Sequence, residues 1–143
     1  MKAISVFVLC TLAVAGKGSA PIEAIDLLRS LSAECLQELG ASEAVFDEMM
    51  KNLPATSMDI KCLRACIMKQ VSVLTPEGKL HKDNALKLVE MHVNGDAEKM
   101  KIARAVGDAC EGIAVPDDHC EAAELYKMCM VDEAKKHGIN EIL

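Results

Sequence analysis

The sequence predicts an all-α fold in a single domain, and three observations support that prediction. Apolar residues recur at three- and four-residue steps along most of the chain, which is the spacing that lines one face of a helix. No stretch alternates apolar and polar residues over the length of a strand. The chain has 143 residues and a hydrophobic fraction of 51%, which suits one core and one domain.

The first fifteen residues are expected to be a signal peptide rather than part of the fold. Met1-Lys2 supplies a positive charge, and residues 3–15 form an apolar run that is too short to span a bilayer comfortably. Small residues at the end of this run predict cleavage before Gly16, which leaves residues 16–143 as the domain. A cut after Ala20 is one alternative. A buried or membrane-anchoring N-terminal helix is another.

The first helix is predicted to begin near residue 22 and to end at Leu39, because the glycine that follows can adopt a left-handed cap. Its apolar face consists of Ile22, Ile25, Leu28, Leu31 and Cys35. Ser42 is expected to cap a short second helix, which Pro54 ends. A third helix is predicted from about Asp59 to Val73, followed by a turn at residues 75–78.

Three further helices are predicted in the second half of the chain. The fourth covers residues 84–93, and the fifth covers residues 96 to about 111. The sixth has the clearest start signal, because Asp118 and Glu121 are spaced as in a capping box. It is expected to reach about Lys136, where basic residues suit the negative end of the helix dipole.

The cysteines constrain the fold most strongly. Removal of the signal peptide takes Cys10 away and leaves an even number in an oxidising compartment, which predicts three disulfides. The remaining cysteines are Cys35, Cys62, Cys66, Cys110, Cys120 and Cys129. Cys62 and Cys66 lie one helical turn apart, so we expect them to bond two different neighbours rather than each other. Six cysteines permit fifteen pairings, and spacing alone does not choose among them.

Several functional classes are disfavoured by composition and motifs. A net charge of −6 with no basic cluster argues against nucleic acid and gives no attraction to anionic lipid. No later stretch reaches the length of a membrane span, so we expect a secreted chain without stable membrane insertion. No nucleophile-elbow, zinc-protease, phosphate-loop or EF-hand motif is present, so no enzyme and no cofactor are expected.

A metal site is also not expected, although one alternative remains open. Cys62, Cys66 and the His119-Cys120 pair have spacings like those of zinc ligands, but secretion and the even cysteine count disfavour zinc. His119 is instead expected at the surface, in the first turn of the last helix.

An all-helical secreted chain with a C-x3-C pair in its third helix and a C-x8-C pair in its last resembles the insect odorant-binding proteins, the pheromone and general odorant-binding protein family. Residues 61–66 (KCLRAC) and 115–124 (VPDDHCEAAE) are similar to stretches of fly general odorant-binding proteins. The resemblance covers residues 20 to 140. It implies the pairing Cys35–Cys66, Cys62–Cys120 and Cys110–Cys129, and about six helices around an internal apolar cavity.

The function that the resemblance implies is that of a carrier. Such a protein reversibly binds small hydrophobic volatile ligands, odorants or pheromones, and carries them through sensillum lymph or a similar fluid to a chemosensory receptor, as a monomer or weak dimer. The family often binds less tightly at acid pH, and His81, His92 and His137 lie near the elements that would cover the pocket. The alternatives are an extracellular signalling or interaction protein with a closed core, and a lipid-surface-binding protein.

The residues expected to line the cavity are inferred from helix faces, and ordinary core packing is the alternative for each. They are Phe46, Met49, Met50, Met68, Val71, Leu86, Val89, Val106, Ile113, Leu125 and Tyr126, with Ile142 contributed by the C-terminal tail as a lid. The tail could equally be a frayed terminus. Few aromatic residues are present, so we expect an adaptable pocket of methionine and aliphatic side chains, in which the Tyr126 hydroxyl could bond a ligand oxygen.

Overall fold

The computed structural model of the chain describes residues 22–51 and 53–140. Within these residues the chain forms six helices: α2 (Ile22–Leu39), α3 (Glu43–Met50), α4 (Met58–Gln70), α5 (Lys82–Val93), α6 (Ala97–Glu111) and α7 (His119–Lys136). The described part holds no strand, only an isolated antiparallel bridge between Leu74 and Leu80. The predicted all-α class is therefore confirmed. The expected signal peptide and Ile142 lie outside the described residues.

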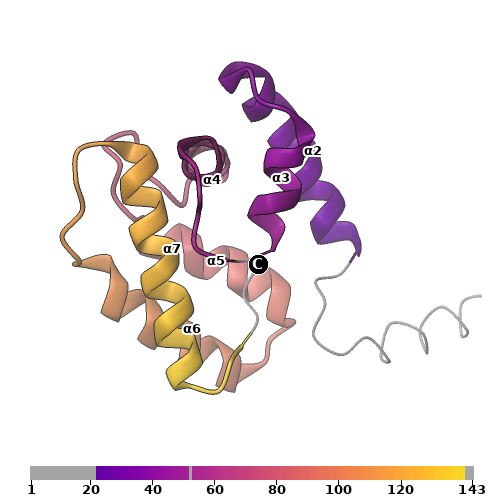
Figure 1. Cartoon of the computed structure of the whole chain (residues 1–143). Coiled ribbons are helices and arrows are strands. Elements are labelled where there is room, and N and C mark those ends of the chain that lie inside the picture. Colours follow the sequence, from indigo (N-terminus) through magenta and orange to yellow (C-terminus); the bar gives the residue numbers. More distant parts are fainter. Residues whose placement is uncertain (1–21, 52, 141–143) are drawn as a thin grey trace, which may run out of the picture.

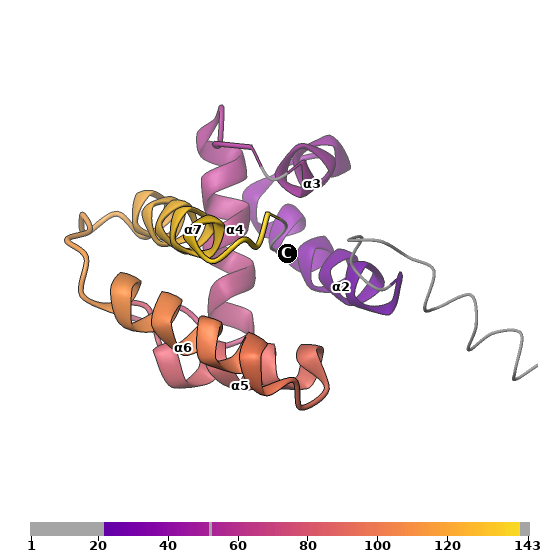
Figure 2. The ribbon, with the colours of Figure 1, turned by 90° about the horizontal axis from the view of Figure 1, so that it is seen from below.

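Helix α4 occupies the centre of the arrangement. It packs against α2 and α3 on one side and against α7 on the other (Figures 1 and 2). Helices α5 and α6 form a hairpin below them. This hairpin packs on the other described helices through the contact between α6 and α7. Among the described helices, the backbone of α5 lies close to that of α6 alone. One face of α5 is therefore not covered by any helix that the structure describes.

The apolar interior is divided into two clusters on opposite faces of α4. The first cluster joins α2, α3 and α4 and contains Cys35, Leu36, Phe46, Leu63 and Ile67. The second joins α4, the α4–α5 loop, α6 and α7 and contains Ala65, Val73, Leu74, Leu80, Val106, Cys110, Ala122, Ala123, Tyr126 and Ala134. Each cluster buries a helix face that alone would expose apolar side chains to water.

Most predicted helix starts are correct, with two corrections at the caps. The Asp118 carboxylate accepts the backbone N–H groups of Cys120 (2.8 Å) and Glu121 (3.1 Å), as an N-cap should. The capping box is nevertheless incomplete, because the Glu121 carboxylate binds the Lys61 ammonium group on α4 instead of the start of its own helix. Ser42 occupies the N-cap position of α3, but its hydroxyl makes no capping hydrogen bond.

Helix α4 ends three residues earlier than predicted. Val71 is its C-cap and Ser72 has a φ of 60°, a left-handed conformation that stops the helix. The apolar residues that extended the predicted helix, Val73 and Leu74, are buried in the loop that follows. The predicted turn at residues 75–78 is confirmed by a hydrogen bond from the Gly78 N–H to the Thr75 carbonyl (2.9 Å).

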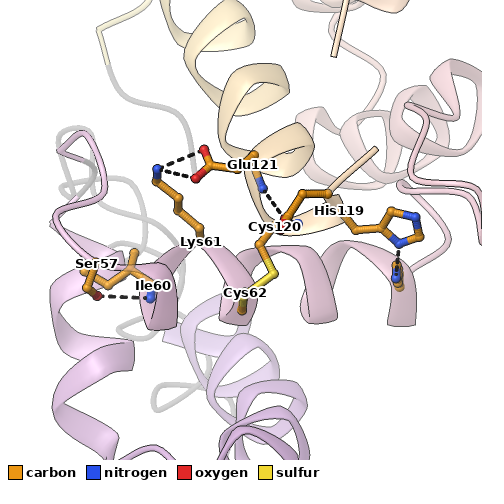
Figure 3. Close-up of a disulfide and its surroundings, with 9 residues drawn as sticks. Ser57, Ile60, Lys61, Cys62, His119, Cys120 and Glu121 are labelled. Carbon is orange, nitrogen blue, oxygen red and sulfur yellow. Dashed lines mark hydrogen bonds and ion pairs between the residues drawn. A yellow bond between two sulfur atoms is a disulfide. The ribbon is translucent and has the colours of Figure 1, made fainter. Parts of the chain in front are cut away.

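Three disulfides connect the helices with the pairing that the family resemblance implied. They are Cys35–Cys66 between α2 and α4, Cys62–Cys120 between α4 and α7, and Cys110–Cys129 between α6 and α7. Figure 3 shows the second of these. Helix α4 is thus bonded to a different helix at each of its two cysteines, as predicted. The zinc alternative is wrong, because Cys62, Cys66 and Cys120 have no free thiolate to offer a metal.

Candidate ligand-binding site

Phe46 and its neighbours lie in the first cluster. The Phe46 ring is only 1% exposed and is enclosed by side chains of α2 and α4. The Arg29 guanidinium carbon lies 4.8 Å from the ring centroid, and the same group forms an ion pair with Glu43 at 3.4 Å. Met49 and Met50 are half-buried and pack against this cluster. These three predicted site residues therefore lie together, with the aromatic ring inside the packing.

Five other predicted residues lie together in the second cluster. Val106 and Tyr126 are buried there, and Met68, Val71 and Ile113 are half-buried against it. They come from α4, α6, α7 and the connections that follow α4 and α6. The structure therefore separates the predicted lining into two groups, and α4 lies between them.

Three of the predicted residues belong to neither cluster. Leu86 and Val89 are half-buried on α5, and Leu125 is 39% exposed on α7. Leu125 shares the outer face of that helix with Met128, which is equally exposed. Of these three, the two on α5 are the better placed for an apolar ligand, because α5 packs on a single described helix and none of its residues is buried.

The apolar side chains of helix α5 are all at least partly exposed to solvent. It carries Leu86, Leu88, Val89 and Met91, yet none of its residues is buried. Met91 is 75% exposed, and Leu27, on α2, is 60% exposed. The backbones of α2 and α5 do not approach each other closely in the described part of the chain. Apolar helix faces that stay unburied in an otherwise packed protein mark a place for an apolar partner.

Sequence reasoning missed Leu27, Leu88 and Met91 as site residues. A signal for two of them was present: Asn84, Leu88 and Met91 are spaced by four and three residues, which places them on one face of α5. That face differs from the one bearing Leu86 and Val89, so the helix presents two apolar stripes rather than one. For Leu27 the spacing gave no such indication.

A surface hollow of about 410 Å³ lies beside the N-terminal end of α5. Its lining consists of Lys69, Ser72, Leu74, Thr75, Pro76, His81 and Asn84. The hollow is open and its lining is of mixed polarity, and none of the predicted ligand-binding residues lines it. It is therefore distinct from the apolar site that the sequence predicts.

The connection between α3 and α4 is fastened along α7 by polar contacts. Arg64 and Glu124 form a buried ion pair, and the second carboxylate oxygen of Glu124 accepts the Ala55 N–H at 2.9 Å. One turn further along α7, the Lys127 ammonium group donates to the Leu53 carbonyl at 3.2 Å. Burial lowers the pKa of both cationic groups, and the charge and hydrogen bond of Glu124 oppose that effect at Arg64. The connection is thereby held against α7.

The α4–α5 loop is held by His119, which was expected at the surface. His119 is instead half-buried, and its Nδ1 atom lies 2.5 Å from the Lys69 ammonium group. Its ring packs directly on Gly78, where an added Cβ would lie 2.5 Å from the imidazole. The surface expectation was wrong because the turn at Gly78 folds back onto the first turn of α7.

Two other properties bear on what the site can do. No helix in the described residues is long and apolar enough to cross a membrane. No group of three or more histidine, cysteine or acidic side chains is arranged to hold a metal among residues 22–51 and 53–140.

Comparison with known proteins gives consistent relationships. Residues 20–133 match the model of the PBP/GOBP family. The chain is 44% identical over 117 residues to general odorant-binding protein 28a of Drosophila melanogaster, an alignment that covers 82% of each chain.

Solved structures show the same relationship. The structure of odorant-binding protein 28a superposes with a TM-score of 0.72 at 44% identity, over 82% of this chain and 97% of that one. A pheromone-binding protein of the cockroach Leucophaea maderae, solved with the fluorescent reporter ANS, gives a TM-score of 0.64 at 25% identity, over 80% and 98% of the two chains.

Proposed function

The chain belongs to the PBP/GOBP family, and we propose that it is a secreted carrier that reversibly binds small hydrophobic ligands at the apolar side chains left unburied on α5 and α2. The observation that supports this site is α5 itself, an amphipathic helix with five large apolar residues and none of them buried. In a signalling protein with a closed core, we would expect these apolar side chains to be buried against the protein itself. That alternative is therefore not favoured.

We infer that the ligands are odorants or pheromones, carried through extracellular fluid to a chemosensory receptor. The names of the relatives support the ligand class, and the mostly aliphatic and thioether side chains of the candidate site support small apolar molecules. Removal of residues 1–15 would release the carrier into that fluid. N-terminal sequencing of the secreted product should begin at Gly16, and a first residue within the apolar run would contradict the proposed leader.

The energy of binding suits a reversible carrier. A ligand with about ten to fifteen buried methylenes gains roughly 8–12 kcal/mol from transfer out of water. Association costs at least about 4 kcal/mol, so about 4–8 kcal/mol remains. Dissociation constants from about millimolar to micromolar follow, and they allow uptake and release without a covalent step.

The test is titration of oxidised protein lacking residues 1–15 with ANS, followed by displacement with aliphatic and terpenoid volatiles. ANS was bound by the cockroach relative, and an extrinsic reporter is needed because the chain contains no Trp. We expect saturable binding at one site and complete displacement by small volatiles. Absence of displaceable binding, with all three disulfides confirmed by mass, would refute the carrier function.

The location of the site is tested with two substitutions on one helix. Val89→Asn places an amide among the apolar side chains of α5 and should weaken ANS binding about tenfold. Lys87→Asn changes an exposed residue of the same helix and should leave binding unchanged. Equal effects of the two substitutions would place the site elsewhere.

Sedimentation of the free and bound protein would establish whether it is a monomer or a weak dimer.

A further inference from the structure

The oxidisable sulfur of the described residues belongs to methionine. Their cysteines are all paired in the three disulfides, so no thiol among them is left to react with an oxidant. The thioether of methionine is the other sulfur group that peroxides oxidise, because its sulfur takes up an oxygen atom. Reaction of the folded protein with a peroxide should therefore occur first at the methionine side chains that solvent can reach.

Met91 is the most exposed of the described methionines. It is 75% exposed near the C-terminal end of α5, against 44% for Met58 on α4 and 39% for Met128 on α7. Met100 on α6 is 8% exposed, and the remaining described methionines are half-buried. The susceptibility of a sulfur atom to a dissolved oxidant follows its exposure, so Met91 should be oxidised first.

Met91 also lies in the candidate ligand-binding site. It is three residues from Leu88 on the same face of α5, and both side chains are exposed. Its thioether belongs to neither apolar cluster of the protein interior. What this side chain contributes is flexible apolar surface on the face that is proposed to hold the ligand.

We propose that Met91 is a peroxide-sensitive modification site and that its oxidation to the sulfoxide releases the ligand. In this step the sulfur lone pair attacks one oxygen of a hydroperoxide, and an S–O bond forms as the O–O bond breaks. The proton of the transferred oxygen moves to the other oxygen, which leaves as water or an alcohol. The sulfur is oxidised and the hydroperoxide is reduced by the same electron pair. The proposal rests on the carrier function proposed above and adds its regulation.

The sulfoxide should weaken binding because it places a polar group on a face that binds through apolar contact. A polar group that is buried against an apolar ligand without a hydrogen-bond partner lowers the affinity, here by about five- to tenfold. The stability of the fold should not change, since the side chain is exposed and lies outside both clusters. Oxidation of Met91 should thus reduce binding without unfolding the protein.

The test measures the ANS dissociation constant of disulfide-bonded protein lacking residues 1–15, before and after treatment with hydrogen peroxide. Peptide mapping by mass spectrometry gives the order in which the methionines gain an oxygen atom. We expect Met91 to be converted first, with a rise in the dissociation constant of about five- to tenfold. Met91→Leu keeps an apolar side chain of similar volume without the sulfur, so it should bind ANS normally and keep its affinity after treatment.

Met58→Leu is the matched control, because it removes an exposed thioether from α4 and should lose affinity as the wild type does. Equal losses in Met91→Leu and the wild type, or oxidation of Met58 before Met91, would overturn the proposal. Unchanged wild-type affinity with Met91 fully converted would do the same, as would a lower Tm of the oxidised protein, since damage to the fold would then explain the loss. Failure of untreated wild-type protein to bind ANS reversibly would instead refute the carrier function.

Discussion

Replacing Arg64 with methionine removes one half of the buried ion pair between α4 and α7 and leaves Glu124 in the interior without its cation. Loss of one partner of a buried pair typically costs about 3–5 kcal/mol, because the remaining charge is desolvated and uncompensated. Glu124 keeps the Ala55 N–H, and the charge of Lys127 is close enough to interact with it. Both contacts moderate the loss, so we expect a value near the lower end, about 3 kcal/mol.

Two further variants identify the origin of that loss. Arg64→Met combined with Glu124→Leu removes both charges and leaves only the Ala55 N–H without an acceptor, which should cost about 1–2 kcal/mol. The double variant should therefore be more stable than the single one. Lys61→Met serves as the control, because the Lys61–Glu121 pair (2.9 Å) also joins α4 to α7 but is more exposed and should cost at most about 1 kcal/mol.

Urea unfolding followed by far-UV circular dichroism, with the disulfides intact, measures all three free energies. The decisive quantity is the difference between the single and double variants. If Arg64→Met were no more destabilising than Lys61→Met, or if removing Glu124 as well made the protein still weaker, the pair would not behave as a buried charge pair and the reasoning would be wrong.

Three other predictions concern the loop, the disulfides and the cap of α5. Gly78→Ala should cost about 2–3 kcal/mol in denaturant unfolding, because Gly78 has a φ of +78° and its new Cβ would meet the His119 ring. The control, Gly40→Ala, should cost only about 1 kcal/mol, because Gly40 has a φ of +64° but open space around it. Equal losses would show that the His119 contact is unimportant. A disulfide that closes a longer loop restricts the unfolded chain more, so its loss should cost more stability. We expect a loss of about 4 kcal/mol for Cys62–Cys120, which spans 58 residues, and about 3 kcal/mol for Cys110–Cys129, which spans 19. The opposite order in thermal unfolding would contradict this reasoning. The His81 ring accepts the Asn84 N–H at 3.2 Å and so caps α5. His81→Ala should therefore cost about 1 kcal/mol in denaturant unfolding and His81→Asn, which can replace the cap, close to none; equal losses would show that the cap is unimportant.

The sequence predicted the helices well because their faces, caps and breaks are local features. The end of α4 could not be predicted in this way. Val71 and Val73 continue the apolar pattern, but the helix stops at Gln70, and the left-handed Ser72 sends Val73 and Leu74 into the second cluster. The side chains after Gln70 are buried through tertiary contacts with α6 and α7, which the local pattern does not contain.

The candidate site was harder to predict for a related reason. A helix face indicates that a side chain is buried, but not whether protein or ligand buries it. Phe46 and Val89 both matched a buried face; Phe46 is enclosed by its own protein and Val89 remains only half-buried. The distinction depends on which helices fail to meet, here α2 and α5, and no spacing along the chain encodes that.

The division of the interior by α4 has a consequence for how such a protein can diverge. The two clusters share α4 and no buried side chain, so substitutions in one should add to substitutions in the other without coupling. A lineage could therefore alter the volume of one half while the other half and the disulfides preserve the fold. Residues of α4 itself lack that freedom, because any shift of this helix reaches both halves at once.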